Sequence, residues 1–150
     1  MTKTGEGRPT VRLRPKPKNE TVSAQMRRMP RASTGPEIAF RKALHAAGFR
    51  FTLHRRDLPG RPDVVLSRPK IAIFIDGCFW HACEEHGTLP KNNREWWKRK
   101  FEGNRERDRR KDEALRAQGW IALHFWEHED VRHMVQRVRL IWIERTAGLR

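Results

Sequence analysis

Three short apolar segments, residues 63–66, 71–75 and 120–126, constrain the fold of this chain more than any other feature. Each is rich in Val, Ile, Leu or Phe and too short for a buried helix, which is typical of a buried strand. A polar turn at residues 67–70 separates the first two segments, and a long charged stretch separates the second from the third. We therefore expect the core to form around a small mixed sheet.

The segment before these strands carries the signals of a helix start and stop. Thr34 or Gly35 is a candidate N-cap, Pro36 suits the first turn, and Glu37 lies near the positive end of the helix. Apolar residues then recur at helical spacing from Ile38 onward. Gly48 ends this pattern.

The remaining elements follow from periodicity. Residues 49–54 alternate well enough to predict an additional strand, and residues 95–118 predict one long, strongly charged helix closed by Gly119. Residues 131–145 predict a last amphipathic helix. The order of helix, three strands, helix, strand and helix predicts an α/β fold, a sandwich around a small mixed central sheet.

Size and charge limit the class of protein. The chain has 150 residues, which suits one domain, and a net charge of +15 from 33 Lys and Arg against 18 Asp and Glu. This balance favours a polyanionic partner, of which nucleic acid is the commonest, although charge alone does not separate DNA from RNA or a membrane surface. With no apolar segment of transmembrane or signal-peptide character, we expect a cytoplasmic protein, in the nucleoid if bacterial.

The N-terminal residues 1–22 are rich in Pro, Lys, Arg, Gly and Thr and have almost nothing apolar to bury. We predict a disordered basic arm there, followed by a folded domain at residues 23–150. Such an arm either lies along phosphates or is only a solvated tail, and the sequence favours neither.

Two carboxylates flank the central strands. Asp63 opens one strand after Gly60-Arg61-Pro62, and Asp76 ends the next. Two neighbouring carboxylates suit Mg²⁺, which nucleases use to activate water and to neutralise the phosphate in the transition state. A Pro-Asp pair by itself is more often only a turn.

A cluster of Cys and His follows Asp76. Cys78, Cys83 and His86 supply three potential ligands of a tetrahedral zinc ion, and His128 is a candidate for the fourth. A closed site of this kind would be structural. The alternative is a pair of buried thiols among surface histidines.

Phe79 and Trp80 are two large aromatics within this same polar loop. They either cover the zinc site or form a wedge that enters the DNA base stack. His81, which follows them, is a candidate general acid or base and equally a candidate zinc ligand.

The charged helix carries a basic stretch at residues 104–111. This stretch is either a solvated face with mixed charge pairs or a surface that contacts phosphates along a duplex. Asp108 within it would be a partner for His81 if it points inward.

Taken together, these motifs resemble the very short patch repair (Vsr) endonucleases of bacteria. The resemblance covers residues 26–128. Its motifs, which keep the order and nearly the spacing of that family, are Met26-Arg27, Glu37, Leu58-Pro59-Gly60-Arg61-Pro62-Asp63, Gly77-Cys78-Phe79-Trp80-His81, Asn104 with Glu106-Arg107-Asp108-Arg109-Arg110, Gly119-Trp120, and Trp126-Glu127.

The resemblance implies a three-layer, restriction-endonuclease-like fold with a structural zinc loop, and a catalytic Mg²⁺. It further implies that Asp63 is the main Mg²⁺ ligand, helped by the carbonyl of Ile75, and that Glu37 supports the metal site. His81 would be the catalytic histidine and Asp108 its carboxylate partner.

The same resemblance implies that Phe79 and Trp80 intercalate at the mismatch, while Met26 and Met29, beside Arg27, wedge from the opposite groove. Departures from the family also occur. Asp76 replaces a histidine and is a catalytic candidate whose role as a carboxylate would differ from that of the histidine. The zinc ligands are rearranged to Cys78, Cys83, His86 and His128.

The implied activity is a nick in one strand of double-stranded DNA, 5′ to the T of a T:G mismatch left by deamination of 5-methylcytosine. A monomer suffices for a single nick, and protein partners from a repair pathway are expected. The alternatives are a zinc-stabilised DNA-binding module without catalysis and a restriction-type nuclease that cuts matched DNA.

Overall fold

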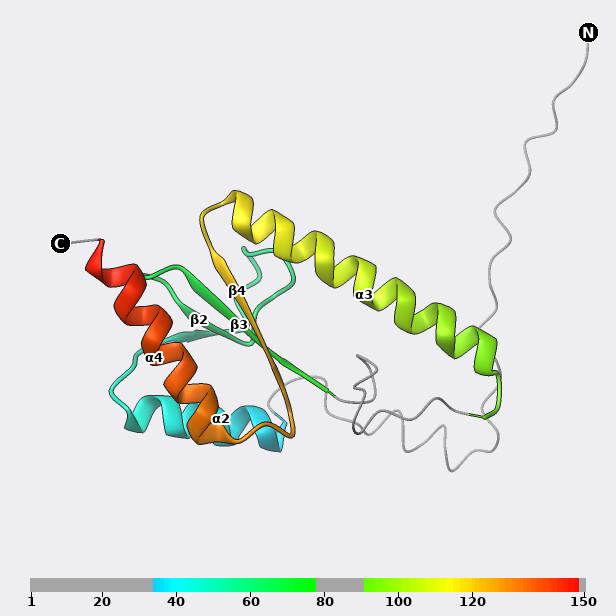
Figure 1. Ribbon diagram of the computed structural model, residues 1–150, viewed down its shortest axis with the longest axis horizontal. Helices are drawn as coiled ribbons and strands as arrows, with labels where there is room; N and C mark the ends of the chain where they lie inside the picture. Colours follow the sequence, from blue (N-terminus) through cyan, green and yellow to red (C-terminus); the bar gives the residue numbers. More distant parts are fainter. Residues whose placement is uncertain (1–33, 78–90, 149–150) are drawn as a thin grey trace, which may run out of the picture.

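The structure, a computed structural model, describes residues 34–77 and 91–148, which form a four-stranded sheet and three helices (Figure 1). In sheet order the strands are β1 (Thr52–Leu53), β2 (Val64–Leu66), β3 (Ile71–Asp76) and β4 (Ile121–Trp126). β2 pairs antiparallel with both β1 and β3, whereas β3 and β4 are parallel. The predicted mixed sheet is confirmed.

Two kinds of connection between strands explain why the sheet contains both antiparallel and parallel pairs. A tight turn joins β2 to β3, in which the N–H of Lys70 donates to the carbonyl of Ser67 at 3.2 Å, so these two strands run antiparallel. The long helix α3 (Arg94–Ala117) lies between β3 and β4 in the chain, and a crossover of that length allows the parallel pairing.

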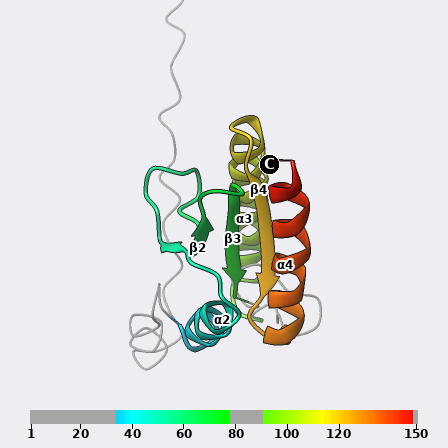
Figure 2. The ribbon, with the colours of Figure 1, turned by 90° about the vertical axis from the view of Figure 1, so that its left-hand side faces the viewer.

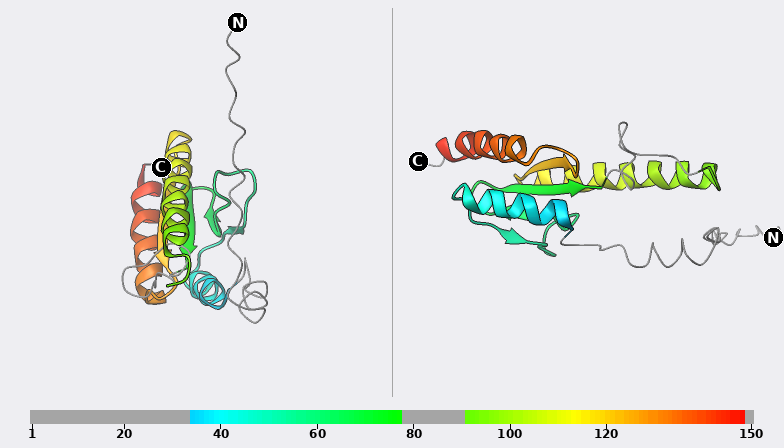
Figure 3. Two further views of the ribbon diagram at one scale, coloured as in Figure 1. Left: turned by 90° about the vertical axis from the view of Figure 1, so that its right-hand side faces the viewer. Right: turned by 90° about the horizontal axis from the view of Figure 1, so that it is seen from below.

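Helices cover both faces of the sheet. Helices α2 (Gly35–Ala46) and α4 (Val131–Ala147) lie on one face and α3 on the other, giving three layers (Figures 2 and 3). The first core contains alternate strand residues with side chains from α2 and α4: Phe40, Leu44, Val64, Leu66, Ile71, Ile73, Leu123, Phe125, Met134 and Val138. The second contains Val65, Ala72 and Phe74 with Leu115 of α3 and Leu58. This split follows from the two-residue period of a strand.

Helix α3 is longer than the sheet that it covers. Its N-terminal half projects past the ends of the strands (Figures 1 and 3). In this half the ring of Trp97 lies 4.9 Å from that of Trp96 and 5.9 Å from that of Phe101, measured between centroids. Leu115, in the C-terminal half of α3, packs into the second core, and Phe101 is the buried residue of the N-terminal half.

Two predictions about the first elements need correction. The strand expected at residues 49–54 is reduced to Thr52–Leu53, and at its C-terminal end the left-handed backbone of His54 (φ 44°) stops the extended conformation. Ile38, expected on the apolar face of α2, is 39% exposed. The predicted basic arm (residues 1–22) and zinc loop lie outside the described residues.

Among the described residues, no helix combines the length and apolar character needed to cross a lipid bilayer.

Candidate active site

Three acidic residues from separate elements meet at one end of the sheet. Glu37 lies in the first turn of α2, Asp63 directly precedes β2, and Asp76 is the last residue of β3. Glu37 is only 5% exposed and accepts a hydrogen bond from Arg41 at 3.1 Å. Asp63 accepts one from the N–H of Ile75 at 2.7 Å, which joins the segment before β2 to the end of β3.

The electrostatics of Asp63 reflect this crowding. Burial raises the pKa of Asp63, and although the hydrogen bond from Ile75 opposes this, the negative charges of Glu37 and Asp76 raise it further, to about 7. A carboxyl group that resists ionisation beside two other acids is typical of a functional site rather than of a structural ion pair.

His54 lies between two of these acids. Its Nε2 is 3.9 Å from Oε2 of Glu37, and its Nδ1 is 3.7 Å from Oδ1 of Asp63. Nε2 is buried and has no hydrogen-bond partner among the described residues. The backbone of His54 is left-handed (φ 44°), a conformation that His adopts more readily than most non-glycine residues.

Gly60 shapes the turn that presents Asp63. Its φ is +79°, and a Cβ added there would lie 3.1 Å from the ring of Phe74 and 3.1 Å from the side chain of Lys111. Both the backbone conformation and the close approach of Phe74 therefore favour glycine at this position. The turn before β2 is closed by a hydrogen bond from the N–H of Arg61 to the carbonyl of Leu58.

His124 of β4 links Asp76 to α3. Its Nδ1 is 2.8 Å from Oδ2 of Asp76, and its Nε2 is 2.9 Å from both carboxylate oxygens of Asp112. The imidazole stacks on Phe74 with a centroid separation of 4.7 Å. Asp108, one helical turn before Asp112, is half-buried on α3, and its predicted partner His81 lies outside the described residues.

Several predicted site residues also lie outside the described residues: the intercalation candidates Met26, Arg27, Met29, Phe79 and Trp80, and the zinc candidates Cys78, Cys83 and His86.

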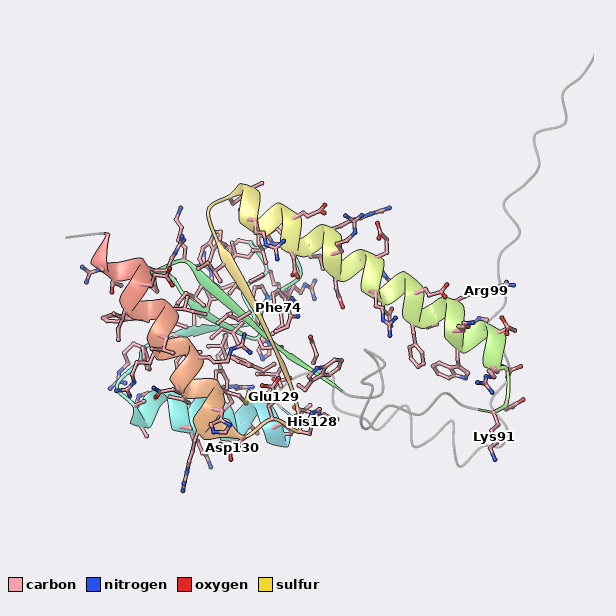
Figure 4. All side chains as sticks on the ribbon, viewed as in Figure 1. Phe74, Lys91, Arg99, His128, Glu129 and Asp130 are labelled. Carbon is pink, nitrogen blue, oxygen red and sulfur yellow. The ribbon has the colours of Figure 1, made fainter. Side chains whose placement is uncertain are left out.

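His128, the fourth zinc candidate, follows β4 in the turn that Figure 4 labels beside Glu129 and Asp130. It stacks on Trp126, and Trp126 is the register partner of Asp76. His128 therefore lies at the sheet end where Asp76 leads into the Cys- and His-containing segment.

Within residues 34–77 and 91–148, no three Asp, Glu, His or Cys side chains are grouped so as to hold a metal ion. The ligand set predicted for Mg²⁺ needs fewer side chains, because Mg²⁺ usually takes one or two carboxylates together with waters and phosphate oxygens.

Comparisons with known proteins identify the family. A family model described as DNA mismatch endonuclease Vsr matches residues 16–86. The chain is 45% identical over 113 residues to the type II nicking enzyme V.XorIIP of Xanthomonas oryzae pv. oryzae, covering 73% of this chain and 82% of that protein. The chain belongs to the Vsr family.

Two further relatives agree with this assignment. The type II nicking enzyme V.NaeI of Lentzea aerocolonigenes is 41% identical over 129 residues, which cover 83% of this chain and 78% of the relative. The DNA mismatch endonuclease Vsr of Escherichia coli (strain K12) is 37% identical over 110 residues, which cover 71% of this chain and 69% of the relative. Membership of the Vsr family makes this chain a DNA endonuclease and disfavours the non-catalytic DNA-binding module.

Sequence analysis missed three polar residues that this Vsr-family structure brings to the site: His54, His124 and Asp112. His124 did carry a signal, since it is a polar residue within an otherwise apolar strand. Asp112 is one of many charged residues on α3 and carries none. His54 ends a short alternating segment, and only its backbone conformation sets it apart.

Proposed function

We propose that this Vsr-family endonuclease nicks one strand of double-stranded DNA 5′ to the T of a T:G mismatch that arises from deamination of 5-methylcytosine. The convergence of Glu37, Asp63 and Asp76 at one end of the sheet carries the proposal, because a nuclease must concentrate acidic ligands where the scissile phosphate binds. The family description names DNA mismatch endonucleases, and the relatives V.XorIIP and V.NaeI are named nicking enzymes.

The residues present fit a Mg²⁺ ion at Asp63. The three acids are mutually repulsive, since the charges of Glu37 and Asp76 raise the pKa of Asp63, and a divalent cation relieves that repulsion. We assign Asp63 and the carbonyl of Ile75 to hold it, with Glu37 as a supporting acid. When bound, Mg²⁺ supplies Lewis-acid stabilisation of the charge that develops on the phosphate.

The protein's own groups orient the site and move protons. The N–H of Ile75 fixes one oxygen of Asp63, and Arg41 fixes the carboxylate of Glu37. We assign His81 to exchange a proton with the attacking water or the leaving oxygen, with Asp108 as its partner. Asp76 takes the place of a histidine in this family's motif and acts as an additional carboxylate.

Recognition of the lesion is assigned to aromatic and apolar side chains. Phe79 and Trp80 would enter the base stack, and Met26 and Met29, next to Arg27, would enter from the opposite groove. Unstacking a T:G wobble costs less than unstacking a matched pair, which favours the mismatch. Arg and Lys outnumber Asp and Glu on α3, which suits phosphate contacts.

We assign a structural Zn²⁺ to Cys78, Cys83, His86 and His128. The position of His128 at the sheet end where β3 leads into the Cys- and His-containing segment supports this set. Such an ion would stabilise the loop that carries Phe79, Trp80 and His81.

The deciding experiment uses a labelled duplex with one T:G mismatch and its T:A counterpart, each in Mg²⁺ and in EDTA. We expect a Mg²⁺-dependent nick beside the mismatched T and none in the matched duplex. Cleavage of both strands of the matched duplex would instead identify a restriction-type nuclease, and cleavage in EDTA would contradict the Mg²⁺ assignment.

A further inference from the structure

His124 forms hydrogen bonds with two acids from different elements, Asp76 at the end of β3 and Asp112 on α3. Its distances of 2.8 Å to Asp76 and 2.9 Å to Asp112 are those of charge-assisted hydrogen bonds. A carboxylate only accepts, so both ring nitrogens must donate, and the imidazole carries both protons. Burial alone would lower the pKa of His124, but the hydrogen bonds to Asp76 and Asp112 raise it to about 9.

The ring is also held in the direction perpendicular to these bonds. His124 and Phe74 stack with an interplanar angle of 9°, and Phe74 lies against the turn at Gly60 that presents Asp63. Two carboxylates therefore fix the imidazole within its own plane, and the ring of Phe74 stacked on it fixes the position of that plane.

Asp76 needs such an anchor. It is the last residue of β3, and its charge opposes ionisation of Asp63. Two like charges favour side-chain rotamers that separate them, so Asp76 would turn away from Asp63 unless a donor held it. His124 provides such a donor, with Nδ1 2.8 Å from Oδ2 of Asp76.

We propose that His124 is a positioning residue of the endonuclease site, which holds the carboxylate of Asp76 beside Asp63 by tying it to Asp112 on α3. This inference rests on the proposed function of Asp63 and Asp76. It gives α3 a second role besides its charge: the helix that crosses from β3 to β4 also anchors the acidic end of β3.

The test compares two replacements of His124. His124→Phe keeps a flat ring to stack on Phe74 but removes both donors, whereas His124→Asn keeps an amide that donates to Asp76. We expect His124→Phe to lower kcat for nicking a T:G duplex by about 10- to 100-fold, the usual effect of losing a group that orients a catalytic ligand. KM should stay unchanged, and His124→Asn should recover most of the lost rate.

A control separates positioning from mere stability. Leu115→Ala disturbs the same interface between α3 and the sheet without removing a polar group, so it should lower the thermal stability but leave kcat near that of the natural chain. Equal kcat losses in Leu115→Ala and His124→Phe, or no recovery in His124→Asn, would overturn the proposal.

A second measurement does not depend on activity. In the ¹⁵N-labelled chain without DNA or metal at pH 7.5, both ring nitrogens of His124 should carry a proton, and a neutral ring would overturn the inference. If the natural chain nicks no T:G duplex, the proposed function fails while this measurement still tests the hydrogen bonds. If the natural chain nicks and His124→Phe nicks equally fast, only the positioning role fails.

Discussion

At the scale of single residues, the position of Asp63 in the site lowers the stability of the folded protein. Asp63 is buried near Glu37 and Asp76 although its ordinary pKa is 3.8 and its pKa in the folded chain is about 7. Because the folded state binds this proton more tightly than the unfolded state, ionisation of Asp63 destabilises the fold. That unfavourable contribution grows as the pH rises from about 4 to about 7 and is constant above.

Asp63→Asn should therefore stabilise the metal-free protein at pH 8, by about 2–4 kcal/mol, while abolishing nicking. The gain should shrink toward zero at pH 4. Urea unfolding in EDTA at both pH values measures it. Asp57→Asn is the matched control, since the hydrogen bond from Arg55 lowers the pKa of Asp57 and its removal should give no gain at pH 8. A variant no more stable than the natural chain at pH 8 would contradict this account.

Gly60 and Gly119 provide a second test at this scale. Both have positive φ, but an added Cβ lies 3.1 Å from Phe74 at Gly60 and no closer than 3.6 Å to any atom at Gly119. Gly119→Ala should cost about 1 kcal/mol for the backbone alone, and Gly60→Ala about 1–2 kcal/mol more. Nicking should fall only for Gly60→Ala, because that turn presents Asp63. Equal losses of stability and of nicking in the two variants would show that the contact between position 60 and Phe74 has no influence on either.

At the scale of elements, each helix start is stabilised differently. Thr34 is the N-cap of α2 as predicted, but its side chain makes no capping hydrogen bond. Asp130, which the sequence analysis did not single out, caps α4 by accepting from the N–H groups of Arg132 and His133 at 2.8 Å and 3.3 Å. A side-chain cap satisfies backbone donors that the helix itself leaves unpaired.

Asp130→Ala should accordingly destabilise the protein by about 1 kcal/mol, whereas Thr34→Ala should change the free energy of unfolding by much less. Denaturant unfolding of the two variants and the natural chain provides the comparison. Nicking by folded Asp130→Ala should be normal. A larger loss for Thr34→Ala than for Asp130→Ala would contradict the assignment of the caps.

At the scale of the whole molecule, the net charge of +15 sets how the protein meets DNA. The labelled Arg99 lies on the half of α3 that projects beyond the sheet, and Lys91 lies just before the start of that helix (Figure 4), so part of this charge lies away from the acidic site. Because these basic residues lie away from Asp63, they can bind phosphates along the duplex without neutralising the acidic side chains of the site.

Affinity for DNA should therefore depend steeply on salt. Between 50 and 200 mM salt we expect the affinity for an uncut duplex in Ca²⁺ to fall by about 10³-fold or more, as for proteins that neutralise several phosphates. The fall should be equal for T:G and T:A duplexes, because the charge contribution is independent of sequence. Fluorescence anisotropy measures both. A flat salt dependence would show that this charge does not contact DNA.

The sequence by itself determined the order of the elements, the three core strands and the Vsr family. Strand and helix periodicity, glycine stops and short motifs are local properties, so the β2–β3 turn and α3 were predicted within a residue or two. The motifs around Asp63 and Gly77-Cys78-Phe79-Trp80-His81 also indicated an endonuclease, because each motif consists of consecutive residues and can be recognised without the fold.

Only the tertiary structure decided which distant side chains meet. His124 faces Asp76 because β3 and β4 pair in parallel with Phe74 opposite His124, a register that no local pattern specifies. Asp112 reaches His124 because α3 lies on that face of the sheet, and His54 lies between Glu37 and Asp63 because its own backbone turns left-handed. Contacts between elements depend on register, helix rotation and packing, which are set by the whole fold.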